Sequence, residues 1–146
     1  MNRREFLERV EGVSSGAVAG GLCLSLGGCL GFHYVNTTLS GNRLLVRRAE
    51  LGRSRFALVQ PPGYRLPLYL YRASDESYSA VSTRCMHRGC QVEPAADHLV
   101  CPCHGSEYTN TGEVLKGPTE RPLRPFRVAL EGDLIVIELP PGGEEW

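Results

Sequence analysis

The sequence contains Cys85-Met86-His87-Arg88-Gly89-Cys90 and, a short way along the chain, Cys101-Pro102-Cys103-His104-Gly105-Ser106. These two segments, the first and the second motif, hold four of the six cysteines and two of the four histidines. Each motif brings a cysteine and a histidine close together, so that a thiolate and an imidazole lie side by side. Both groups are metal ligands, and their clustering indicates metal binding rather than a disulfide framework alone.

Zinc is one metal that accepts two cysteines and two histidines as ligands. Structural zinc sites, however, usually use cysteine pairs separated by two residues. Neither motif contains a pair with that spacing. The spacing therefore argues against a zinc site.

Taken together, the two motifs closely resemble the C-x-H-x-G-C and C-x-C-H-G-S motifs of Rieske iron–sulfur proteins. The resemblance is to the disulfide-containing kind found in cytochrome bc-type complexes and arsenite-oxidase small subunits, and it extends over roughly residues 55–139. It implies one [2Fe–2S] cluster, with Cys85 and Cys101 on one iron and His87 and His104 on the other. Because neutral imidazoles replace two thiolates, the expected potential is roughly −150 to +300 mV, against about −400 mV for plant-type ferredoxins.

The resemblance also assigns roles to the neighbours of these ligands. Cys90 and Cys103 would form a disulfide that joins the two loops, which would contribute about 3 kcal/mol and require an oxidising compartment; two free thiols are the alternative. Ser106 and Tyr108 would donate hydrogen bonds to a bridging sulfide and a ligand sulfur and so raise the potential. The alternative is that Ser106 caps a turn and Tyr108 fills the core.

The function that the resemblance implies is one-electron transfer, without an organic substrate of the chain's own. One hypothesis is the iron–sulfur subunit of a quinol–cytochrome c reductase-like complex, with cytochrome partners and with quinol bound at His104. A second is a small subunit of a larger oxidoreductase, as in arsenite oxidase, and a third is a stand-alone ferredoxin-like carrier. Two departures from the quinol-oxidising pattern keep these open, since Arg88 replaces the usual Leu and Met86 the usual Thr. The segment Lys116-Gly117-Pro118 resembles the proline loop that covers the cluster in this family.

The N-terminal segment, residues 1–32, resembles a twin-arginine export signal or a membrane anchor. Arg3-Arg4 is followed by Phe6-Leu7, and no charged residue occurs from Gly12 to Phe32. This stretch is long enough to span a bilayer of about 30 Å, yet it is only mildly apolar. Three fates remain open: cleavage, retention as an anchor, or lipidation at Cys29. We expect export to the periplasmic side of the cell envelope with a membrane tether.

The rest of the chain predicts an all-β fold, a small sandwich or barrel carrying a cluster-binding subdomain. Residues 33–43 are expected to be a polar linker, residues 44–139 the domain, and residues 140–146 a flexible tail. The candidate strands are short runs of β-branched and aromatic residues broken by Pro, Gly and Asp. They lie at residues 44–46, 56–59, 68–71, 78–82, 99–100, 127–130 and 134–139. Glu131-Gly132-Asp133 is expected to form a tight hairpin turn before a buried strand.

The charge of the chain is balanced, with 16 Lys and Arg against 16 Asp and Glu. This composition favours neither disorder nor nucleic-acid binding. The basic residues are nearly all Arg, with Lys116 the only lysine, and they are scattered along the sequence. We interpret them as a solvated surface rather than a basic docking patch.

Overall fold

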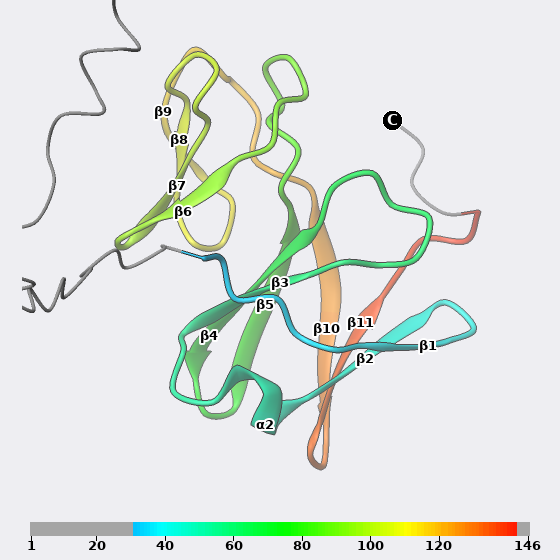
Figure 1. The fold of residues 1–146 in the computed structure, drawn as a ribbon. Helices are drawn as coiled ribbons and strands as arrows, with labels where there is room; N and C mark the ends of the chain where they lie inside the picture. The colour runs from blue at the N-terminus through cyan, green and yellow to red at the C-terminus, as the bar shows by residue number, and fades with distance from the viewer. Residues whose placement is uncertain (1–30, 143–146) are drawn as a thin grey trace, which may run out of the picture. The chain divides into compact units, whose positions relative to one another are not determined.

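The computed structural model describes residues 31–142. The N-terminal segment, except for its last two residues, and the final four residues of the tail lie outside this range. Within it, eleven strands and one short helix, α2 (Arg48–Leu51), follow each other along the chain (Figure 1). The strands are β1 (Thr38–Ser40), β2 (Arg43–Arg47), β3 (Phe56–Val59), β4 (Leu68–Ser74), β5 (Ser77–Ser82), β6 (Glu93–Ala95), β7 (His98–Val100), β8 (Glu107–Tyr108), β9 (Val114–Lys116), β10 (Pro125–Glu131) and β11 (Leu134–Glu138). No helix of residues 31–142 is both long and apolar enough to cross a membrane.

The larger of two antiparallel sheets has seven strands in the order β1-β2-β11-β10-β5-β4-β3. Its β10–β11 hairpin turns where we expected it, with Glu131 paired to Leu134 and Gly132 at a φ of +60°. A glycine adopts this left-handed conformation without the steric penalty that a Cβ brings. The following strand is buried at Ile135, Val136 and Ile137, as its apolar sequence predicted.

The segment expected to be a polar linker is part of this sheet instead. Leu58 in β3 donates a hydrogen bond to His33 O (2.7 Å) and accepts one from Val35 N (3.1 Å). A few residues later the chain forms β1 at the opposite edge of the sheet. Residues 33–40 therefore run from one edge strand to the other, and they cover backbone groups of β3 that would otherwise be unpaired. The linker prediction was wrong because β1 has only three residues and all of them are exposed. Such a strand has no alternation of buried and exposed residues by which the sequence would reveal it.

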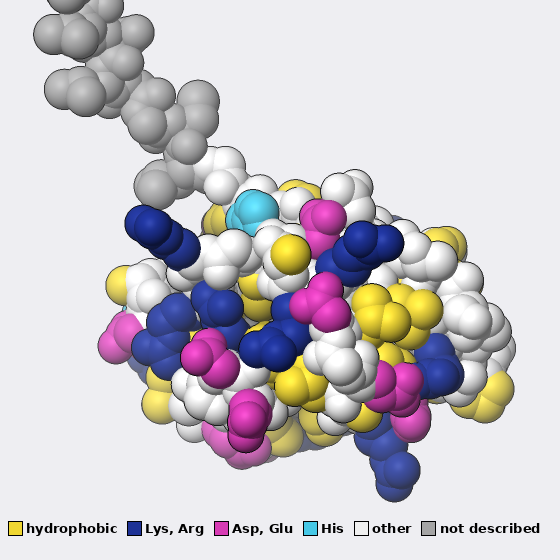
Figure 2. Space-filling model, turned by 90° about the horizontal axis from the view of Figure 1, so that it is seen from below, with side chains coloured by type: hydrophobic (Ala, Val, Ile, Leu, Met, Phe, Trp, Pro, Cys, Tyr) yellow, Lys and Arg dark blue, Asp and Glu magenta, His cyan; other side chains and the backbone are white. Residues whose placement is uncertain are grey.

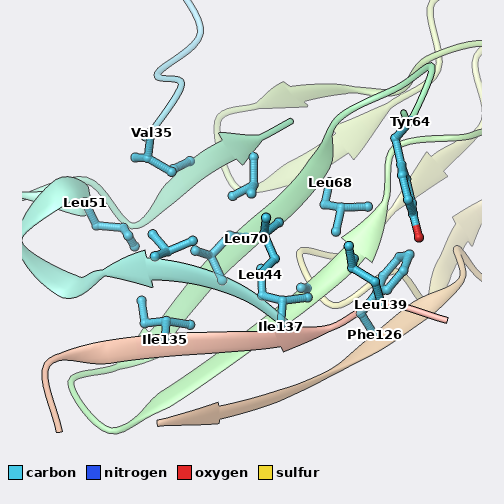
Figure 3. Close-up of a cluster of buried hydrophobic side chains, with 14 residues drawn as sticks. Val35, Leu44, Leu51, Tyr64, Leu68, Leu70, Phe126, Ile135, Ile137 and Leu139 are labelled. Carbon is cyan, nitrogen blue, oxygen red and sulfur yellow. The ribbon is translucent and has the colours of Figure 1, made fainter. Parts of the chain in front are cut away.

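The main core fills the interior of the larger sheet (Figure 3). Leu44 and Val46 alternate with less buried neighbours along β2, which is the period of two expected for a strand with one covered face. Opposite them, Leu68 and Leu70 of β4 point into the same space as Ile137. Burial of such side chains contributes about 1.5–3 kcal/mol each, and this core holds the larger sheet together.

The smaller sheet has four strands in the order β6-β7-β8-β9 and packs on the other face of β3, β4 and β5. Leu58, Tyr69 and Val81, which lie between the inward residues of these strands, join Leu99 of β7 and Tyr108 of β8 in a second core. Because successive side chains of a strand point to opposite faces, one set of strands serves both cores. This second core also contains Cys85 and Cys101, so it fixes the base of both motifs.

The all-β fold class is confirmed, with α2 the only helix among residues 31–142. Each predicted strand is present, most of them within one or two residues of the expected ends. The prediction missed β1, β6, β8 and β9, which have two or three residues each.

Candidate metal centre

The two motifs form two loops with the same backbone design at one end of the described domain (Figure 1). In each loop the N–H of the first cysteine bonds to the carbonyl five residues later, and a glycine N–H bonds back to that cysteine's carbonyl. The glycines, Gly89 and Gly105, have φ values of +78° and +76°. The bonds are Cys85 N to Cys90 O (2.8 Å), Gly89 N to Cys85 O (2.8 Å), Cys101 N to Ser106 O (2.8 Å) and Gly105 N to Cys101 O (2.9 Å).

A disulfide between Cys90 and Cys103 joins the two loops. It was expected from the resemblance alone, with free thiols as the alternative. The sulfurs of Cys90, Cys101 and Cys103 lie within 4.8 Å of one another. Because two of these sulfurs are bonded to each other, only Cys101 offers a thiolate, and the trio is not itself a metal site. Its closeness shows instead that the disulfide packs directly against an expected ligand.

The four expected ligands form two close pairs in these loops. Cys85 and Cys101 are free thiols, 2% and 1% exposed, and their side chains are close enough to hydrogen-bond. The rings of His87 and His104 lie edge to face with centroids 4.8 Å apart. His87 is half-buried and His104 is exposed.

An orphaned atom shows that this donor set fits a metal group. His87 Nδ1 is buried and has no hydrogen-bond partner, which is a costly arrangement for a polar nitrogen unless another group binds it. Two adjacent thiols and two adjacent imidazoles also match the S2N2 donor set of a Rieske cluster. The residues present therefore fit a [2Fe–2S] group.

The thiols differ in acidity because their surroundings differ. Burial acts to raise the pKa of the Cys85 thiol, but hydrogen bonds from the Tyr108 hydroxyl and the His87 and Arg88 backbone hold that pKa below its ordinary value. Burial raises the pKa of Cys101, and the nearby Cys85 sulfur raises it further, although backbone N–H groups oppose the change. Donors around Cys85 thus favour negative charge on its sulfur.

Tyr108 and Ser106 are both fully buried under the loops. The Tyr108 hydroxyl lies 3.3 Å from Cys85 Sγ, and it accepts a hydrogen bond from Met86 N at 3.3 Å. Burial and the contact with Cys85 raise the pKa of Tyr108 to about 12, so the hydroxyl keeps its proton. Ser106 Oγ accepts a hydrogen bond from Thr119 N at 3.2 Å, which leaves its own proton free to be donated.

The connection from β9 to β10 contributes residues that sequence reasoning missed. Thr119 follows the cis Gly117–Pro118 bond and is 5% exposed, in contact with Ser106. Arg121 Nη2 lies 3.5 Å from Met86 O in the first loop. The proline segment pointed to this region, but a threonine and an arginine in a polar stretch carry no signal of their own.

Comparisons with known proteins agree with a [2Fe–2S] site. Residues 35–127 match the Rieske [2Fe-2S] domain. The cytochrome b6-f complex iron-sulfur subunit of Chlorobaculum tepidum is 43% identical over 65 residues, which are 43% of this chain and 36% of that protein. The cytochrome b6-f complex iron-sulfur subunit 3 of a Nostoc species is 29% identical over 152 aligned positions, covering 94% of this chain and 84% of the relative.

Among solved structures, the cyanobacterial plasma membrane Rieske protein of Synechocystis is similar, with a TM-score of 0.55 and 33% identity. The match covers 63% of this chain and 94% of that protein. The chain spans only 34–42% of the length of the first several curated relatives. The family match nevertheless includes both motifs and most of the described domain. The chain therefore belongs to the Rieske [2Fe-2S] domain family, and its cofactor is one [2Fe–2S] cluster.

Proposed function

We propose that Cys85 and Cys101 bind one iron of the cluster and that His87 and His104 bind the other. The observation that carries this assignment is that the same two loops hold a pair of adjacent buried free thiols and a pair of adjacent imidazoles, one of which has an orphaned nitrogen. When bound, the cluster accepts and releases one electron at a time. The chain's own residues set how readily it does so.

The surroundings of the thiols favour the reduced state. The Tyr108 hydroxyl is directed at Cys85 Sγ, and the Ser106 hydroxyl has a proton to donate. Hydrogen bonds to the sulfurs stabilise the negative charge that reduction adds. The low exposure of both cysteines also keeps water from the thiolate side, while the exposed His104 leaves the imidazole side open to a partner.

We further propose that the chain is the iron–sulfur subunit of a quinol–cytochrome c reductase-like complex, with cytochromes as electron partners. The family and the names of the curated relatives support this role. The exposed imidazole of His104 is the group that would meet a quinol hydroxyl. The test is purification from membranes, where a cytochrome b should accompany the chain, whereas a larger catalytic subunit would contradict the proposal.

The proposed redox role is tested on the full chain produced with its cluster. The expected result is an electron paramagnetic resonance spectrum typical of a histidine-ligated [2Fe–2S] centre. Circular dichroism between about pH 6 and about pH 10 should give a midpoint potential above 0 mV that falls as pH rises, since the imidazoles lose protons more readily when the iron is oxidised. A potential below roughly −100 mV, independent of pH, would exclude quinol as the donor.

The proposed location is the periplasmic side of the cell envelope, reached by a twin-arginine route and kept there by a membrane tether. The disulfide supports an oxidising compartment, because such bonds are rare in the cytosol. The export signal itself, at Arg3 and Arg4, lies outside the described residues. Replacing both residues by Lys should retain the protein in the cytoplasm on cell fractionation, and unchanged export would refute this route.

A further inference from the structure

Three arginines that are distant in the sequence meet beside the first motif. Arg84 precedes Cys85, Arg88 lies within the loop, and Arg121 comes from the β9–β10 connection. All three line one hollow, together with Cys85, Met86, His87 and Gly89. No Asp or Glu lines this hollow. Arginines that appeared scattered along the sequence therefore form a basic rim, Arg84–Arg88–Arg121, next to an expected cluster ligand.

The charge of this basic rim is not neutralised by the protein. No carboxylate of residues 31–142 forms an ion pair with any of the three arginines. Glu120, the acidic residue next to Arg121, is exposed and forms no such pair. By contrast, the only lysine, Lys116, pairs with Glu107 at 3.0 Å. At the other end of the domain, Figure 2 shows Asp and Glu side chains interspersed among Lys and Arg.

Two of the guanidinium groups lie close to uncharged atoms of the first loop. A Cβ added at Gly89 would lie 3.2 Å from Arg84 Nε and 3.3 Å from Nη2, so this guanidinium lies against the glycine. Arg121 Nη2 lies 3.5 Å from Met86 O. Arg88 is exposed and completes the rim.

The rim lacks the features of an apolar docking surface. The exposed large hydrophobic residues of the described domain are Phe32, Tyr34, Leu39 and Leu115, and none belongs to either loop. A basic surface beside a redox centre attracts and orients partners of the opposite charge. We propose that the Arg84–Arg88–Arg121 rim is the docking surface for a redox protein that presents carboxylate groups. This inference rests on the proposed electron-transfer function and names the kind of partner that function requires.

The test follows the oxidation of the reduced full chain, with its cluster, by two one-electron acceptors in stopped-flow experiments. One acceptor is an acidic plant plastocyanin and the other is a basic mitochondrial cytochrome c. At low salt the acidic acceptor should react faster by roughly tenfold or more, and the preference should shrink at high salt as the charges are screened. Arg88→Glu should abolish the preference, whereas Arg88→Lys should retain it.

Arg53→Glu is the matched control, because Arg53 is an exposed arginine in the turn after α2 and does not line the hollow. It changes the net charge by the same amount as Arg88→Glu and should leave the preference intact. Equal effects of the two substitutions would overturn the docking surface, as would rates that are independent of salt. Arg88-dependent sedimentation with anionic vesicles, without any acceptor preference, would identify a lipid surface instead and also overturn it.

The resonance spectrum and midpoint potential of each variant separate this inference from the proposed function. An intact signal with no preference for the acidic acceptor overturns the docking surface alone. Absence of a histidine-ligated cluster signal in the unmodified chain overturns the redox function and the docking surface together.

Discussion

The hydroxyl of Tyr108 is a single group through which we propose that the protein acts on its redox centre. It lies 3.3 Å from Cys85 Sγ in a site from which water is excluded. In Tyr108→Phe the reduced state loses this donor, and we expect the midpoint potential to fall by roughly 40 mV for each kcal/mol that the hydrogen bond contributes. Protein-film voltammetry measures the change. Tyr71→Phe is the control, since the Tyr71 hydroxyl contacts Arg55 instead, and an equal fall there would refute the assignment.

The acidity of Tyr108 gives the same residue a predictable pH dependence. Its pKa is raised from 10.0 to about 12 by burial and by the contact with Cys85. Between these values the folded state binds more protons than the unfolded state, so the contribution to stability is full below pH 10 and is lost as pH rises through about 12. Urea unfolding at increasing alkaline pH should show a steeper loss of stability in the unmodified protein than in Tyr108→Phe.

Gly112 occupies a position where a Cβ would collide with side chains of the second core. Its φ is +92°, and a Cβ there would lie 3.1 Å from side-chain atoms of both Leu123 and Val81. Gly63 has a similar φ of +80° but open space around it. Gly112→Ala should therefore destabilise the fold by about 1 kcal/mol or more beyond Gly63→Ala, which carries the backbone strain alone. Chemical denaturation gives both values, and equal losses would show that contact with Leu123 and Val81 is unimportant.

At the scale of elements, the disulfide is the one covalent bond between side chains of the two loops. Cys90 and Cys103 are separated by 13 residues, and a bridge that closes a loop of this size contributes about 3 kcal/mol. The double variant Cys90→Ala, Cys103→Ala should lower the melting temperature on the order of 10 °C. Differential scanning calorimetry measures this shift. A melting temperature equal to that of the unmodified protein would mean that the loops hold their positions without the bond.

The elements also show which parts of the fold the sequence predicts. Strands with a buried face, such as β3 and β4, carry runs of apolar residues and were predicted. In the smaller sheet, β6 contains Pro94 and β8 has two residues, so these strands are stabilised by the pairing around them and leave no local pattern. The two motifs that carry the proposed ligands could be recognised from the sequence because each is a continuous segment. The contributions of Thr119 and Arg121 depend on a chain reversal that places them over the loops, and only the folded structure reveals it.

At the scale of the whole molecule, residues 33–36 decide where a stable fragment begins. His33 and Val35 exchange hydrogen bonds with Leu58, Val35 is 8% exposed, and Asn36 Nδ2 donates to Glu50 at 3.2 Å. A fragment that starts at Thr37 loses these contacts and should be less stable by about 3 kcal/mol than one that starts at Gly31. Guanidinium unfolding of the two fragments measures the difference. Equal midpoints would mean that the covering of β3 is dispensable.

The pairing of β5 with β10 has a consequence for how the molecule is divided. Val81 faces Pro125 across this pair, and Ser82 N donates to Arg124 O at 2.8 Å. Residues 83–124, which include both motifs, the disulfide and the whole smaller sheet, thus leave the larger sheet and return to it at one point. They constitute an insertion between two strands that are already neighbours. The redox site is therefore carried by a self-contained insertion. Replacing residues 83–124 by a short turn would preserve every strand pair of the larger sheet, so the same sheet can accept a different insertion at this position.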